Sequence, residues 1–166
     1  MPRAPEGLPW LGLAIRIGAA AVWIVAGAAK LPDMDGFRTL VERYGILPHV
    51  LAAPFAFLLP FVEIALGLYL AVGLFVRGTA AAGTALFAVF LAAQATAWAR
   101  GLNLDCGCFG AAVQTKVGPL TMLRDLGLGV PTFLMLALPA RRFSLDKRLF
   151  GARDAFDGGA TRVETS

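Results

Sequence analysis

Four long apolar segments limit this chain to few possible folds. They cover roughly residues 8–29, 50–76, 79–99 and 119–138, and each approaches or exceeds the ~20 mainly apolar residues that cross a bilayer as a helix. A bilayer core leaves only helices and closed β-barrels as spanning structures. Because the runs are continuous and do not alternate, the sequence predicts an all-α integral membrane protein, a four-helix bundle.

Composition excludes the soluble classes. Hydrophobic residues make up 58% of the 166 residues and charged residues 16%, against about 45–50% and about 25% in a soluble domain. Half of the net charge of +4 lies in the C-terminal tail, and no basic stripe with interleaved aromatics points to nucleic acid. We expect a short N-terminus (1–7), a membrane domain (8–139) and a basic, partly flexible tail (140–166).

The first segment has a competing interpretation as a cleavable signal peptide. Arg3 and the small residues around Ala26 resemble such a signal, but the apolar stretch exceeds the about 7–15 residues typical of one. Arg16 also interrupts it. We therefore expect a retained helix, with a tight turn around Arg77-Gly78 joining the second and third spans.

The distribution of Lys and Arg predicts the orientation. Four spans put both termini and the Arg77 turn on one side, which collects more basic residues than the other. The positive-inside rule then makes the termini cytoplasmic. The loop from Arg100 to Gly118 faces outward from a bacterial inner membrane, on the oxidising side.

This outward loop contains both cysteines of the chain, Cys106 and Cys108, separated by Gly107. Thiols this close can form an intramolecular disulfide, since their Cα atoms can lie within about 4.4–6.8 Å. So small a ring is strained, and strained exposed disulfides are the labile, catalytic kind. A static staple is disfavoured because it removes little unfolded-state entropy. A resident metal is not expected, although two thiolates could hold Cu(I).

Two further residues bear on thiol reactivity. Asp105 precedes Cys106, and its negative charge would raise the pKa of a neighbouring thiol. His49, in the other outward loop, could act in the opposite sense as a positive neighbour or proton acceptor. The alternative interpretation is that His49 is an ordinary surface histidine with no effect on the thiols.

Four charged residues lie inside the predicted spans: Arg16, Glu63, Arg124 and Asp125. Ionisable groups in a membrane are costly and indicate function by default. Their expected depths in the membrane favour an ion pair between Arg16 and Glu63. Arg124 is expected to pair with Asp125 or with a polar group such as Gln94. The alternative is that these pairs only set helix register.

Residues near the span ends indicate the interfaces. Lys30 should extend to the outer interface. Trp10, Trp98 and Tyr44 fit an aromatic belt, with a quinone or flavin site as the alternative.

Taken together, these stretches resemble the MauE family of methylamine-utilisation membrane proteins, within the wider DoxX-like group. The most specific match is the run Asp105, Cys106, Gly107, Cys108, Phe109 and Gly110. The other matching stretches, in order, are 16–30, 44–48, 59–63 with Gly67, and 123–125.

The resemblance implies a four-helix membrane protein linked to thiol–disulfide chemistry. The MauE family is needed to mature the disulfide-rich small subunit of methylamine dehydrogenase, and the resemblance implies a role in disulfide formation or electron transport in the periplasm. On that view Cys106 and Cys108 form the redox pair, and Arg16, Glu63 and Arg124 form a polar framework beneath it. Partners would be thioredoxin-like or disulfide-containing extracytoplasmic proteins.

Three functions stay open at this stage. The first is thiol–disulfide exchange, with a membrane quinone as candidate electron carrier. The second is a non-catalytic assembly factor for a secreted oxidoreductase, and the third is a Cu(I)-binding membrane protein. The residues do not decide whether the chain is an enzyme, which thiol attacks, the direction of electron flow or the oligomeric state.

Overall fold

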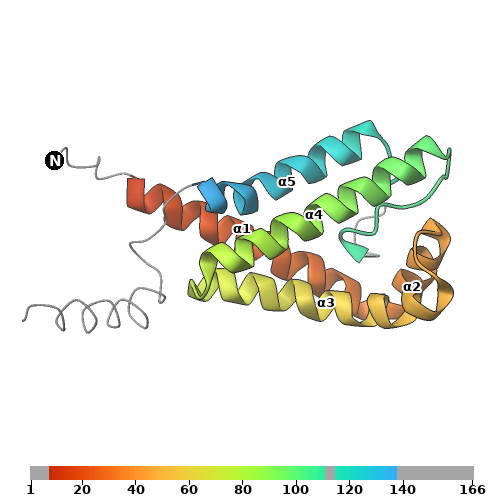
Figure 1. Cartoon of the computed structure of the whole chain (residues 1–166), viewed down its shortest axis with the longest axis horizontal. Coiled ribbons are helices and arrows are strands. Elements are labelled where there is room, and N and C mark those ends of the chain that lie inside the picture. Colours follow the sequence, from red (N-terminus) through yellow and green to blue (C-terminus); the bar gives the residue numbers. More distant parts are fainter. Residues whose placement is uncertain (1–7, 111–114, 138–166) are drawn as a thin grey trace, which may run out of the picture.

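The computed structural model describes residues 8–110 and 115–137. The predicted all-α membrane bundle is confirmed: four long helices run side by side, and a short helix crosses one end (Figure 1). The predicted segments 1–7 and 140–166 lie outside the described residues. The elements in order are α1 (Leu8–Lys30), η1 (Leu31–Asp33), α2 (Met34–Tyr44), α3 (His49–Val72), α4 (Val76–Ala99) and α5 (Pro119–Ala137).

Three stretches of the described chain are long and apolar enough to cross a membrane: Trp10–Tyr44, His49–Val72 and Val76–Ala99. Helix α5 has 19 residues and carries two charged side chains, and it packs along α1 and α4. A fourth crossing by α5 stays a prediction.

The exposed surface of the bundle is rich in large hydrophobic side chains, and its interior includes charged side chains beside an apolar core. Large hydrophobic side chains such as Val50, Phe57 and Val89 are more than half exposed, as expected for side chains that contact lipid tails. The buried side chains include Lys30 and Glu63. Lys and Glu are almost never fully buried in proteins unless they are paired.

Small residues let α1 and α3 approach closely. A Cβ on Gly27 would lie 2.6 Å from the carbonyl oxygen of Pro60, and one on Gly67 would lie 2.8 Å from that of Ala20. Such contacts are typical of membrane helix interfaces, where close packing replaces the hydrophobic effect between helices. Deeper in the bundle, Trp23 is 1% exposed and donates a 3.1 Å hydrogen bond to Thr132.

The turn between α3 and α4 lies earlier than predicted. Gly73 adopts a left-handed conformation (φ 76°), and its N–H bonds to the carbonyls of Tyr69 and Leu70. Gly73 therefore ends α3, as glycine commonly does at this position. Arg77 and Gly78 belong to the first turn of α4, so the predicted limits at residues 76 and 79 were wrong by a few residues.

Helix α2 lies where a connecting loop was expected. Asp33 caps it by accepting a 2.9 Å hydrogen bond from the N–H of Gly36, and Gly45 ends it in a left-handed conformation. Phe37, Leu40, Val41 and Tyr44 recur at helical spacing and pack inward. The resulting amphipathic helix crosses the end of the bundle beside α3 (Figure 1).

Candidate functional site

The cysteine loop is a tight turn held at its base. A backbone bridge pairs Asp105 with Lys116, and the N–H of Cys106 donates to the carbonyl of Thr115 at 2.9 Å. Gly107 and Gly110 have positive φ angles of 73° and 54°. A Cβ on Gly110 would also collide with the backbone of α1. The backbone conformation therefore requires glycine at both positions. The absence of a side chain lets the turn pack closely against α1 and α2.

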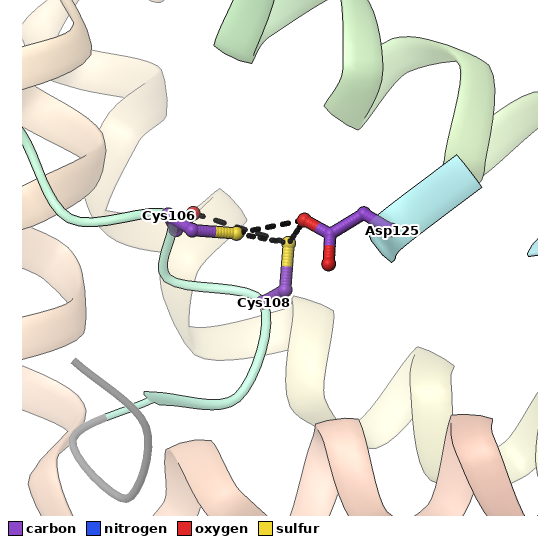
Figure 2. A group of neighbouring side chains, drawn as sticks. All are labelled: Cys106, Cys108 and Asp125. Atoms are coloured by element: carbon purple, nitrogen blue, oxygen red, sulfur yellow. Dashed lines mark hydrogen bonds between the residues drawn. The ribbon is translucent and has the colours of Figure 1, made fainter. Parts of the chain in front are cut away.

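The two thiols face each other and one carboxylate (Figure 2). Both cysteines are free, and their Sγ atoms lie 2.7 Å apart. Oδ2 of Asp125 on α5 lies 3.0 Å from Sγ of Cys106 and 3.3 Å from Sγ of Cys108. One oxygen is thus within reach of either thiol proton.

The carboxylate of Asp125 is buried and firmly positioned. Its exposed fraction is 2%. Arg124 donates to Oδ1 at 2.9 Å, and Gln94 of α4 donates to Oδ2 at 2.9 Å. The predicted pairing of Arg124 with Asp125 is confirmed. Gln94, the alternative partner predicted for Arg124, instead donates to Asp125.

Cys108 is held as a neutral thiol. Its hydrogen bond with Cys106 and its burial raise its pKa above the ordinary thiol value, and the negative charge of Asp125 adds to the effect. The acidic neighbour that contacts the thiols is Asp125. The chain neighbour Asp105 instead pairs with Lys116 at 3.3 Å.

A buried ion pair lies directly beneath the loop. Nζ of Lys30 contacts the two carboxylate oxygens of Glu63 at 2.9 and 2.8 Å, and both side chains are 1% exposed. The same amine donates to the backbone carbonyl of Cys108 at 2.7 Å and to that of Ala26 at 3.1 Å. The pair therefore ties the cysteine loop to the membrane helices.

This arrangement corrects two predictions. Lys30 does not extend to the interface, because it is buried against Glu63. Glu63 does not pair with Arg16, because it lies level with Gly27. Eleven residues of helix separate Gly27 from Arg16, about 16 Å at 1.5 Å per residue. Arg16 is buried elsewhere in the bundle and is not part of the thiol site.

Tyr44 links α2 to the loop. Its hydroxyl lies 3.2 Å from the carbonyl oxygen of Asp105 and 3.3 Å from that of Cys106. The side chain is buried, so its assignment to an interfacial belt was wrong. Trp10 and Trp98 are 65% and 54% exposed, as an interfacial position requires.

The remaining predicted residues divide into two groups. Phe109 lies near the site, with its ring centroid 5.6 Å from the guanidinium carbon of Arg124. His49 is exposed at the start of α3. Among the described residues no hydrogen bond or ion pair joins it to either cysteine. The pairing of Lys30 with Glu63 was not predicted from the sequence. A lysine at the end of one apolar run and a glutamate inside the next could have predicted this ion pair.

The thiol cluster could also bind a cation. One ligand atom from each of Cys106, Cys108 and Asp125 lies within 4.8 Å of the others. Two sulfur ligands suit a soft ion such as Cu(I), and the set is too small for the usual four-ligand structural zinc site.

Comparison with known proteins identifies the relatives of the chain. A family model described as methylamine utilisation protein MauE matches residues 8–138. The methylamine utilization protein MauE of Paracoccus denitrificans is 34% identical over 138 residues, covering 80% of this chain and 74% of its own. The MauE of Methylophilus methylotrophus is 32% identical over 133 residues, with coverages of 79% and 70%. No solved structure matches significantly.

Proposed function

Since the chain belongs to the MauE family, we propose that it is a membrane thiol–disulfide redox protein that serves a partner outside the cytoplasm. One observation carries the proposal. The sulfurs of Cys106 and Cys108 lie 2.7 Å apart, and a single carboxylate oxygen of Asp125 is within 3.3 Å of both. Little movement separates this dithiol from a disulfide, and a proton acceptor is already in place.

The exchange proceeds through a mixed disulfide. A partner thiolate attacks one sulfur of the Cys106–Cys108 disulfide, forming an intermolecular S–S bond and releasing the other sulfur as a thiolate. The second partner thiol then breaks that bond. The partner leaves with a disulfide, and this chain keeps two thiols, having gained two electrons and two protons. Asp125 passes a proton to or from the sulfurs at Oδ2.

Arg124 and Lys30 act as positioning residues in this scheme. Arg124 pairs with the side chain of Asp125 at 2.8 Å and so keeps it beside the thiols. Lys30 holds the carbonyl of Cys108, which prevents the short turn from moving away from Asp125.

Two lines support the location and the partner. The Lys and Arg distribution supports an outward cysteine loop in the inner membrane, where disulfides persist. The curated relatives are named for methylamine utilisation, which supports a protein of methylamine utilisation as the client.

Trapping experiments test the proposal. Cys106→Ser and Cys108→Ser should each be expressed in cells and run on non-reducing gels. At least one variant should accumulate a mixed disulfide that a reductant removes, and the double variant should give none. If neither variant traps a partner and secreted proteins keep their thiol status, the redox proposal is wrong. Client maturation that survives loss of both cysteines would instead favour an assembly factor.

A second candidate function follows from the three-ligand cluster. Cu(I) bound by Cys106, Cys108 and Asp125 would make the chain a soft-metal protein. Equilibrium titration of the purified, reduced protein with Cu(I) separates the two functions. Tight binding that the double serine variant loses, without any trapped partner, would favour the metal.

A further inference from the structure

An apolar cavity lies directly beside the thiols. Its volume is about 140 Å³, and α2, α3 and α4 provide its walls, with Leu40, Phe55 and Phe90 among them. Both cysteines line it. The two thiols therefore border an apolar cavity inside the bundle.

The cavity opens on the lipid-facing side of the bundle. Two lining residues, Ile46 and Val89, are 51% and 57% exposed. Val89 belongs to a helix long and apolar enough to span the membrane, ten residues before its end at Ala99. This position is about 15 Å from the helix end, so an apolar molecule can enter from the bilayer.

One buried polar group at the cavity lacks a partner. Gln94 lines the cavity and is 2% exposed. Its Nε2 donates to Asp125, but among the described residues its Oε1 accepts no hydrogen bond. An unpaired buried acceptor costs about 1–3 kcal/mol, and a ligand hydroxyl would satisfy it.

From these features we propose that the cavity binds the ring of a lipid-soluble quinone, which oxidises the Cys106–Cys108 dithiol. The volume is close to that of an engineered cavity of about 150 Å³ that binds benzene, so one six-membered ring fits. The isoprenoid tail leaves through the opening into lipid. A fatty-acyl chain would also suit apolar walls, but it has no acceptor for the electrons of the thiols. The quinol that forms on reduction also carries a hydroxyl donor for Oε1 of Gln94.

The reaction balances without any further reagent. Two S–H bonds break and one S–S bond forms between Cys106 and Cys108. The two electrons reduce the quinone to a quinol, and the two protons go to its oxygens, with Asp125 Oδ2 placed to relay them. The quinol hydroxyl near Gln94 donates to Oε1 before the product diffuses away. This inference rests on the proposed function and adds the final electron acceptor.

The test uses the full chain, reduced and reconstituted in lipid nanodiscs, with decyl-ubiquinone as the probe. Quinone absorbance and cysteine alkylation should show one quinone reduced per dithiol oxidised. Ala93→Phe puts a ring inside the cavity, and Val89→Trp covers its opening from an exposed position that tolerates bulk. Each should slow quinone reduction at least about tenfold, because the first substitution fills the ring's volume and the second blocks its entry. Exchange with a soluble disulfide should stay unchanged.

Ala92→Phe is the matched control, since the neighbouring Ala92 is exposed and lies outside the cavity lining; it should keep the wild-type rate. Equal quinone reduction in all three variants would show that the ring does not use this cavity and would overturn the inference. So would a dithiol that exchanges with proteins but never reduces quinone, an outcome that leaves the proposed function intact. A dithiol inert toward both would overturn the proposed function as well.

Discussion

Nζ of Lys30, at the end of α1, lies 2.7 Å from the carbonyl oxygen of Cys108, 78 residues later in the chain. The same amine is paired with Glu63 of α3. A charge pair inside the bundle thus supports the backbone of the cysteine loop. Changes in the charge pair should therefore affect the loop, and changes in the loop should affect the pair.

Breaking this pair from one side should be costly. Lys30→Met leaves the Glu63 carboxylate buried and unpaired, which costs about 3–5 kcal/mol. The double variant Lys30→Met/Glu63→Met should recover most of that loss. Thermal unfolding of the reduced protein in detergent measures it. Arg38→Ala, which breaks the exposed pair with Glu42, should change stability by no more than about 1 kcal/mol. A Lys30→Met protein as stable as this control would contradict the role of the buried pair.

Asp125→Asn should separate thiol acidity from thiol oxidation. The amide removes a negative charge next to Cys108, so the pKa of Cys108 falls and its alkylation at pH 8 becomes faster. Oxidation should slow by about 10²-fold or more, because the proton acceptor is lost. Asp105→Asn, with its carboxylate directed at Lys116, should alter neither rate substantially. A merely structural role for Asp125 would shift both rates in the same direction.

The stability of the reduced protein should depend on pH. The folded-state pKa of Cys108 is raised above the unfolded value of about 8.5. Its contribution to folding is therefore fully present below pH 8 and is lost as pH rises through the alkaline range. Thermal unfolding at pH 7 and pH 10 should show a larger drop for the wild type than for Cys108→Ala. Identical drops in both proteins would rule out Cys108 as the cause.

Impermeant labelling can test the orientation. In a variant without native cysteines, Lys116→Cys should react with a membrane-impermeant maleimide in intact spheroplasts, because Lys116 is exposed in the cysteine loop. Arg77→Cys, exposed at the opposite end of the bundle, should react only after the membrane is opened. The reverse pattern would place the thiols in the cytoplasm.

Several features could be predicted from local sequence. Continuous apolar runs predicted the helices, since no other backbone satisfies its hydrogen bonds in lipid. The Cys106–Cys108 spacing and the adjacent charges Arg124 and Asp125 indicated the site. Helix α2 was missed although Phe37 and Tyr44 mark an apolar face, because its polar residues resemble those of a loop.

The sequence by itself determined the helical membrane class, the family and the identity of the two thiols, since these depend on composition, run length and short motifs. Only the tertiary structure decided that Lys30 pairs with Glu63, that Asp125 reaches both sulfurs, and that an apolar cavity opens beside them. Such partners are set by the depth and rotation of packed helices. In a low-dielectric interior, a small change in the depth or rotation of a helix decides which charged side chains are close enough to pair.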